Sequence, residues 1–277
     1  KKVFILAGEA SGDALGAWYI RRATLQGDVA VYDAIGGPLL AGAGARLHDS
    51  YAELQVVGIA EIIRHLPRLL TKMSAITQLI VQGQYDEVVL VDFPGFNLRM
   101  LTRLKKLLPT CRIIYLSPPQ MWVWGAWRAR KLALADRIIV LYPFEVAWYR
   151  EHVGLTVEWW GSPVLEKIDE AVPQLPLVKE RMIALLPGSR PQEIAVLMRW
   201  FAPVIAQVCK QEPGITLAVI LSPAVSREAI EQAFAEHQVP QYAAALRYVV
   251  DEKEKYQVLA RCCAALTKPG TNTLELA

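Results

Sequence analysis

A single carboxylate, Asp92, directly follows an apolar run and opens the segment Asp92-Phe93-Pro94-Gly95-Phe96-Asn97. The carboxyl end of a buried strand is where α/β folds place catalysis, so Asp92 could remove the proton from an attacking hydroxyl. Asn97 could cap the helix that follows. The structural alternative is that Asp92 only caps a strand-to-helix turn, and this segment alone does not decide between the two.

A second candidate segment, Gly8-Glu9-Ala10-Ser11-Gly12-Asp13, follows the first apolar run. Its small residues let the backbone pass close to a ligand, and Ser11 or Asp13 could cap a helix whose N-terminus attracts anions. The carboxylates of Glu9 and Asp13 argue against a plain pyrophosphate site. A tight turn before a capped helix is the structural alternative.

The best candidate for binding a diphosphate lies in the second half of the chain, between Leu185 and Ile194. Gly188 frees the backbone, Ser189 and a helix N-terminus offer donors, and Arg190 offers a bidentate fork. The alternative for Arg190 is a solvated surface side chain.

Polar residues also follow the last predicted strand, in the segment Pro269–Glu275. Hydroxyls and amides at the start of a helix could hold phosphate and ribose hydroxyls together, although a capping box gives the same pattern. The candidate residues are Gly270, Thr271, Asn272, Thr273 and Glu275.

Three tryptophans, Trp122, Trp124 and Trp127, lie within six residues of a loop that follows a strand. Aromatic faces suit sugar rings and acyl chains, and an indole N–H suits a polar rim. A purely structural role in the core is the alternative, but three such side chains in one loop are hard to bury together.

The segment from Leu54 to Ile80 is mostly helical by its apolar period. Arg64, Arg68 and Lys72 recur every four residues and form one basic stripe beside the apolar Ile62, Leu66 and Leu69. Such a helix can lie on an anionic lipid surface. The alternative is a helix packed on a sheet with its charges in water.

The elements that must position these segments alternate between short β-rich runs and amphipathic helices, which predicts parallel sheets covered on both faces. We expect two Rossmann-like domains, 1–168 and 169–277, with a linker over Glu166–Lys179, where Pro173 and Pro176 fall. The predicted strands are Val3–Ala7, Ala30–Ile35, Glu87–Asp92, Arg112–Ser117, Arg137–Leu141, Met182–Leu186, Ile215–Leu221, Leu246–Val250 and Ala264–Thr267. The predicted helices, besides 54–80, are Ala14–Arg22, Leu98–Leu108, Arg128–Ala135, Pro143–His152, Gln192–Lys210, Arg227–His237 and Lys253–Arg261.

Composition narrows the class of protein. The chain of 277 residues is 53% hydrophobic, with a net charge of only +3, which argues against nucleic acid as a partner. No apolar run reaches the roughly 18 residues of a membrane span, and we see no secretory signal. We interpret Cys111, Cys209, Cys262 and Cys263 as reduced thiols of a cytoplasmic protein. We expect the second domain to be incomplete at the end of the sequence.

Together these segments resemble the lipid-A-disaccharide synthase family, in order and through essentially the whole chain. The matching motifs are Gly8–Asp13, Gly36–Pro38, Val57–Ile59 with the basic helix after it, Asp92–Asn97, Ser117–Trp124, Pro143–Glu145, Leu186–Glu193 and Gly270–Glu275. Each motif is weak evidence alone, but eight in register are strong.

The resemblance implies a GT-B fold and an inverting glycosyltransferase that needs no metal or other cofactor. It implies transfer of 2,3-diacylglucosamine from UDP-2,3-diacylglucosamine to 2,3-diacylglucosamine 1-phosphate, giving the β-1,6-linked disaccharide 1-phosphate of lipid A biosynthesis, and UDP. Asp92 would be the base on the acceptor 6-hydroxyl. Gly188, Ser189 and Arg190 would hold the donor diphosphate. The remaining assignments are the 270–275 segment for UDP, and Glu9, Ser11, Asn97, Trp122 and Trp124 for the acceptor side.

The same resemblance implies a peripheral protein on the inner face of a Gram-negative inner membrane, with the basic helix toward the lipid, and it leaves a homodimer open. One departure stands out, because Ser162 occupies the position where the family usually has His in Gly-His-Pro. Two alternatives therefore remain, namely another GT-B enzyme such as a UDP-GlcNAc 2-epimerase-like protein, and a non-catalytic nucleotide-sugar or lipid-binding homologue.

Overall fold

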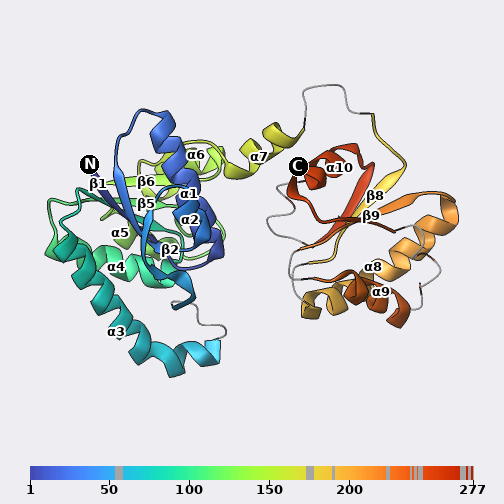
Figure 1. Cartoon of the computed structure of the whole chain (residues 1–277), viewed down its shortest axis with the longest axis horizontal. Coiled ribbons are helices and arrows are strands. Elements are labelled where there is room, and N and C mark those ends of the chain that lie inside the picture. The colour runs from blue at the N-terminus through green and yellow to red at the C-terminus, as the bar shows by residue number, and fades with distance from the viewer. Residues whose placement is uncertain are drawn as a thin grey trace. The chain divides into compact units, whose positions relative to one another are not determined.

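A computed structural model gives the architecture of the chain (Figure 1). For residues 53, 59–68, 191 and 192 it describes the backbone alone. The described residues are 1–53, 59–172, 178–188, 191–222, 225–237, 239, 242, 246–268, 273 and 276. The chain divides into two compact units, Lys1–Pro163 and Val164–Ala277, each with its own parallel sheet.

The sheet of the first unit has seven strands in the order β3-β2-β1-β4-β5-β6-β7, and every neighbouring pair is parallel. Its central strands are almost wholly apolar and buried, as expected for a sheet covered on both faces. The strands are β1 (Lys2–Ala7), β2 (Val31–Gly36), β3 (Arg46–Ser50), β4 (Glu87–Val91), β5 (Arg112–Leu116), β6 (Arg137–Val140) and β7 (Glu158–Trp159).

Helices cover both faces of this sheet, because alternate residues of a strand point to opposite sides. Phe4, Val88 and Leu90 pack with residues of α3, α4 and α6, whereas Ile5 and Val89 pack with α1. The helices are α1 (Ala10–Leu25), α2 (Pro38–Gly42), α3 (Ile59–Gly83), α4 (Pro94–Leu107), α5 (Ala129–Leu132) and α6 (Pro143–Val153). Two short 3-10 turns, η1 (Tyr51–Glu53) and η2 (Ala126–Arg128), complete the unit.

The strand order reverses between β1 and β4. From β1 the chain proceeds to β2 and β3 on one side, and then returns to β4 on the other side of β1. Ala7 of β1 is paired with Val91 of β4, so the loops after these two strands begin side by side. Such a reversal is where open α/β sheets bind their ligands, outside the carboxyl ends of the strands.

The second unit also has a parallel sheet, with four strands in the order β10-β9-β8-β11. Helices α8 and α9 cover one face, with a core around Phe201 and Phe234, and α10 covers the other, with Val258 and Leu259. The elements are α7 (Pro163–Ala171), β8 (Met182–Leu186), α8 (Pro191–Gln211), β9 (Thr216–Ile220), α9 (Arg227–Glu236), β10 (Leu246–Val249), α10 (Glu252–Arg261) and β11 (Ala264–Thr267).

The expected linker over Glu166–Lys179 is wrong in its first part, because α7 runs through it. Proline at the first helical position starts this helix, and Val164, Leu165, Ile168 and Ala171 form a narrow apolar stripe. Nine residues were too few to show a clear period. Residues 173–177 lie outside the described part of the chain.

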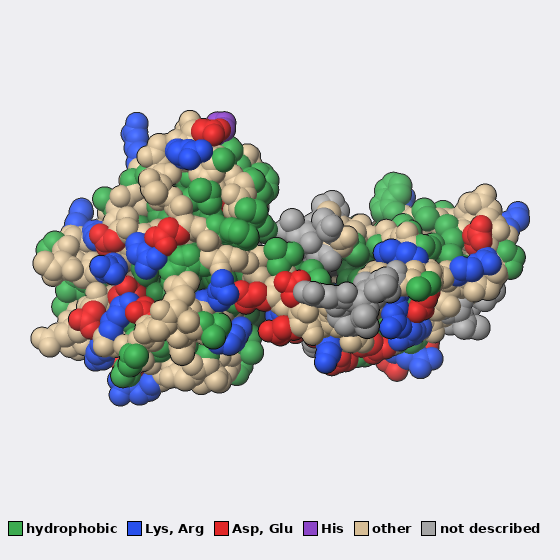
Figure 2. All heavy atoms as spheres, turned by 90° about the horizontal axis from the view of Figure 1, so that it is seen from above, with side chains coloured by type: hydrophobic (Ala, Val, Ile, Leu, Met, Phe, Trp, Pro, Cys, Tyr) green, Lys and Arg blue, Asp and Glu red, His purple; other side chains and the backbone are tan. Residues whose placement is uncertain are grey.

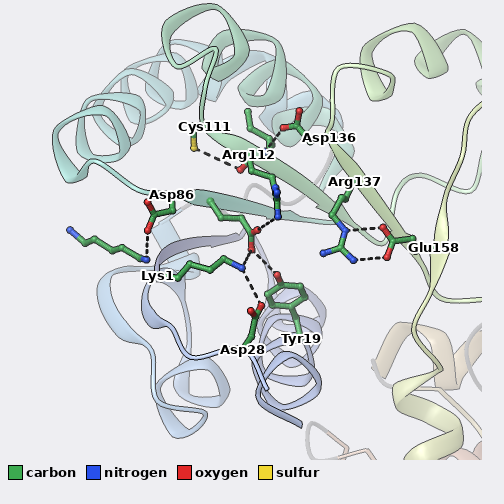
Figure 3. Close-up of polar contacts among 12 residues, drawn as sticks. Lys1, Tyr19, Asp28, Asp86, Cys111, Arg112, Asp136, Arg137 and Glu158 are labelled. Carbon is green, nitrogen blue, oxygen red and sulfur yellow. Dashed lines mark hydrogen bonds and ion pairs between the residues drawn. The ribbon is translucent and has the colours of Figure 1, made fainter. Parts of the chain in front are cut away.

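Charged side chains join the amino-terminal ends of the strands, at the edge away from the Asp92 loop (Figure 3). Glu87 is buried at the start of β4, where it accepts a hydrogen bond from the Tyr19 hydroxyl at 2.9 Å and lies 3.2 Å from the Lys1 ammonium. Arg137 forms a two-bonded pair with Glu158, at 2.8 and 2.5 Å. These pairs link neighbouring strands, so the polar residues at this edge stabilise the sheet.

Helix α3 runs along the lower margin of the first unit in Figure 1. Its last turns pack on the core through Met73, Ile76 and Ile80. None of the described helices is both long and apolar enough to cross a membrane.

Candidate active site at the carboxyl ends of the strands

Asp92 is the first residue after β4, at the point where the strand order reverses. It adopts a left-handed backbone conformation, φ 45°, and so does Phe93. Its N–H donates to the Leu116 carbonyl at 2.8 Å, and its own carbonyl accepts from the Tyr115 hydroxyl at 2.9 Å. Two consecutive left-handed residues are costly unless the surroundings hold them, and such positions concentrate at functional sites.

The Asp92 carboxyl has a raised pKa of about 6. Burial is the main cause, the nearby negative charge of Glu9 adds to it, and a backbone hydrogen bond from Phe93 opposes it. A base works best when its pKa is close to the working pH, so this carboxylate suits proton abstraction near neutrality. No side-chain hydrogen bond caps α4, so the capping alternative for Asp92 is not what the fold uses.

Glu9 lies in the loop between β1 and α1, and Ser11 lies in the first turn of α1. The Ser11 hydroxyl donates to the Glu9 carboxylate at 2.5 Å. Gly8 packs directly beneath the Phe93 ring, since a Cβ added there would stand 2.4 Å from its Cδ1 atom. The loops after β1 and β4 are therefore in contact, and they bring two carboxylates to one place.

The expectation that Ser11 or Asp13 caps α1 is wrong. Helix α1 begins at Ala10 after Glu9, and no side chain caps it. The buried Asp13 carboxylate instead caps α2, because it accepts from the N–H groups of Gly37 at 2.7 Å, Leu39 at 3.0 Å and Leu40 at 3.1 Å. This Asp has a structural role that only the tertiary fold reveals.

Asn97 does not cap α4 either. It is fully buried, and its amide donates to the carbonyls of Val91 at 2.9 Å and Asp92 at 3.0 Å. It therefore offers no exposed surface to an acceptor, and its contacts hold the Asp92 loop in place instead. The sequence singled out Asn97 as a helix cap, because its position fits a capping pattern. The hydrogen bonds from Asn97 back to Val91 and Asp92 depend on the folded structure and could not be predicted.

The tryptophan loop follows β5, the strand next to β4. Trp124 and Trp127 are each 62% exposed and meet edge to face at 4.9 Å. Trp122 is more enclosed and donates from Nε1 to Glu145 at 3.2 Å. Burial raises the pKa of Glu145, a residue at the start of α6 that no sequence pattern marked beyond the Pro-Phe-Glu motif. The loop thus offers an exposed aromatic face at the same edge as Asp92.

In the second unit, Gly188 follows β8 with a φ of 110°, a conformation that favours glycine. Lys268, which follows the neighbouring strand β11, forms an ion pair with Glu193 at 2.7 Å. Sequence reasoning missed Lys268, although its place just before Pro269 is a signal. Thr273 is exposed. Ser189, Arg190, Gly270, Thr271, Asn272 and Glu275 lie outside the described residues.

Of the basic stripe on α3, the structure describes the side chains of Leu69 and Lys72 only. Leu69 is half-buried against the core of the first unit, and Lys72 forms an ion pair with Asp49 at 3.1 Å. The side chains of Ile62, Arg64, Leu66 and Arg68 lie outside the described part.

The sequence that forms this site matches a known protein family. A family model described as "Lipid-A-disaccharide synthetase" matches residues 3–277. A lipid-A-disaccharide synthase of Alkalilimnicola ehrlichii is 34% identical over 285 residues, which cover 99% of this chain and 72% of that protein. That of Geobacter sulfurreducens is 32% identical over 284 residues, covering 100% and 71%.

Solved structures agree on the fold. A UDP-GlcNAc 2-epimerase from Neisseria meningitidis, bound to UDP-GlcNAc, has a TM-score of 0.59 at 11% identity and covers 98% of this chain and 78% of its own. So low an identity shows only the α/β fold of the GT-B class. The named relatives favour neither the epimerase-like nor the non-catalytic alternative. On the match over residues 3–277, the chain belongs to the lipid-A-disaccharide synthetase family.

Proposed function

We propose that this protein transfers 2,3-diacylglucosamine from UDP-2,3-diacylglucosamine to the 6-hydroxyl of 2,3-diacylglucosamine 1-phosphate, with Asp92 as the general base. One observation carries this proposal. Asp92 is a half-buried carboxylate with a pKa of about 6, at the reversal of strand order, in a chain of this family. The relatives are lipid-A-disaccharide synthases, which supports a reaction that forms this disaccharide, and the position of Asp92 supports its role as the base.

The chemistry balances with one base. Asp92 takes the proton of the acceptor hydroxyl while that oxygen forms a bond to the anomeric carbon of the donor sugar. The bond from that carbon to the UDP oxygen breaks, and its electron pair leaves with UDP. A single displacement of this kind inverts the anomeric carbon and needs no second carboxylate as nucleophile. Burial raises the Asp92 pKa, the negative charge of Glu9 adds to this effect, and together they keep the base effective near neutral pH.

For the donor we propose the loop after β8. Gly188 gives the backbone freedom for close approach, and Arg190 supplies the charge for the diphosphate. Arg190→Ala should weaken UDP binding by about 1.5–3 kcal/mol, the cost of losing hydrogen bonds to a charged group. Arg199→Ala, on the exposed side of α8, is the matched control. Equal UDP affinity in the two variants would remove Arg190 from the donor site.

The reaction itself is tested by mass spectrometry. The protein expressed from its whole gene is incubated with both substrates, and the product is sought as the disaccharide 1-phosphate. Product that disappears with Asp92→Asn, while UDP affinity stays, supports both the reaction and the base. A folded, UDP-binding protein that forms no disaccharide contradicts the proposal, and reverting Ser162→His would then show whether the departure at that position is the reason.

We further propose that α3 carries the protein to an anionic membrane surface on the cytoplasmic side. The basic spacing of Arg64 and Arg68 supports this, with each cation contributing about 1 kcal/mol near such a surface. Arg64→Gln combined with Arg68→Gln should lower binding to anionic vesicles roughly 10-fold or more. The control is Arg103→Gln with Lys106→Gln on α4. Equal losses in both double variants would assign the effect to net charge rather than to α3.

A further inference from the structure

A small pocket opens beside the Asp92 loop, between α4 and the segment that joins η2 to α5. Its volume is about 200 Å³, and its wall begins at Pro94 and Gly95, two and three residues after Asp92. Three cationic side chains line it, Arg99 from α4, Arg128 from η2 and Lys131 from α5. Among the described residues of the wall, none is acidic.

No carboxylate among the described residues neutralises these three cations. Within the part of the chain that the structure describes, no carboxylate forms an ion pair with Arg99, Arg128 or Lys131. On the face of the first unit that Figure 2 shows, acidic and basic side chains lie side by side. The pocket therefore gathers three cations and, among its described lining residues, no carboxylate.

The pocket is also shaped in advance. The Arg128 guanidinium lies over the rings of Trp124 and Trp127, at 4.6 and 5.6 Å from their centroids, which fixes the side chain by stacking. The Arg99 guanidinium donates from Nη1 to the Gly95 carbonyl at 2.6 Å, one helical turn back. Arginine forks that are already held in place lose less conformational entropy when they bind a phosphate.

We propose that this pocket binds the phosphate monoester of the acceptor, an inference that rests on the proposed function. A monoester carries nearly two negative charges near neutral pH, which three cations can match. In the acceptor, the phosphate is on the anomeric oxygen at C1 and the attacking hydroxyl is on C6, which is bonded to C5. The ring oxygen joins C1 to C5, so the phosphate and the hydroxyl belong to the same sugar ring. Gly95 and Arg99 are about 6 Å apart along α4. A phosphate anchored here leaves the sugar to reach back toward Asp92, with Trp127 beside it.

The test compares two lipids, 2,3-diacylglucosamine 1-phosphate and the same lipid without its phosphate, each bound at equilibrium from micelles of neutral detergent. Arg99→Gln and Lys131→Gln should each weaken binding of the phosphorylated lipid about 10-fold, as for the loss of one hydrogen bond to a charged group. Neither should change binding of the lipid that lacks phosphate. Arg130→Gln is the control, because Arg130 neighbours Lys131 on α5 but does not line the pocket.

Each outcome decides something. Unchanged affinity for the phosphorylated lipid overturns the inference, and so does an equal loss for both lipids, which indicates a disturbed fold. Should the variants instead lose binding to acceptor-free vesicles of anionic phospholipid, with acceptor affinity intact, the pocket is a site for membrane headgroups. Phosphate-dependent binding by a protein that makes no disaccharide would leave the pocket assigned and the proposed reaction refuted.

Discussion

Replacing Asp92 by asparagine should abolish most of the activity and, at the same time, stabilise the protein. The raised pKa of about 6 means that the fold favours the protonated form of this carboxyl over the charged form. In the unfolded chain this carboxyl has its ordinary pKa of 3.8, so it ionises at a lower pH. Asparagine resembles the neutral acid, and it tolerates the left-handed backbone that Asp92 adopts.

The size of this gain in stability, and the pH range over which it changes, follow from the pKa shift of Asp92. The native state binds the Asp92 proton more tightly than the unfolded state, whose carboxyl has its ordinary pKa of 3.8. Stability from this group is therefore complete below pH 3.8 and is lost as the pH rises through about 6. The full shift corresponds to about 3 kcal/mol, and we expect about 1–2 kcal/mol because Asp92 keeps some contact with water.

Urea unfolding at a series of pH values between about 4.5 and 7.5 measures this difference. The gain from Asp92→Asn should be small at the acid end and level off above pH 6. Asp28→Asn is the matched control, because Asp28 forms an exposed ion pair with Lys1 at the opposite edge and should gain nothing. A gain that does not depend on pH, or a loss of stability near neutrality, would refute the account of Asp92 as a carboxyl whose pKa is raised by burial.

Further substitutions test the contacts around the site. Wild-type kcat/KM should fall as the pH drops below about 6, as the base takes up its proton, and a flat profile there would exclude Asp92 as the base. Asp13→Ala should lower the free energy of unfolding by about 3 kcal/mol, because the two buried N–H groups of Gly37 and Leu40 and the partly buried N–H of Leu39 lose their acceptor; Asp13→Asn should cost less in the same urea titration. Gly8→Ala forces a methyl group against Phe93 and should cost about 1–3 kcal/mol and reduce kcat, with Phe93→Ala in the same chain recovering part of both. Tyr19→Phe should cost about 1–2 kcal/mol by removing a hydrogen bond from buried Glu87, and an unchanged urea midpoint would contradict this.

The sequence predicted the parallel sheets and the position of Asp92 after a strand because both have local signatures, whereas the role of Asp92 as a base stays a prediction. Val88 to Val91 is a short, β-branched apolar run, which favours a buried strand, and a carboxylate after such a run lies at the edge where α/β folds place their ligands. Strand β3 was missed because its residues are polar and mostly exposed, so no alternation marks it. The short helix α2 was missed as well, since five residues show no period.

Contacts between distant segments were beyond the reach of the sequence. Asp13 and its partners on α2 are 24 or more positions apart, and a capping pattern next to Asp13 offered a simpler but wrong explanation. The cationic pocket combines residues of α4 with residues near α5, whose ordinary appearance as surface charges gave no signal. Such sites emerge only when the topology brings the helices together.

The reversal of strand order also governs how the chain can fold while it is being synthesised. The central strand β1 pairs on one side with β4, and Phe4 meets Val88, 84 residues further along the chain. At typical rates of translation, β1 waits roughly 5–15 seconds for this partner, with one of its edges unpaired. Its residues are almost entirely apolar, so the nascent chain exposes a strand edge prone to association during that interval. The pairing of β1 with β4 brings Glu9 close to Asp92. It also leaves one edge of β1 open to association until β4 and the Asp92 loop have been synthesised.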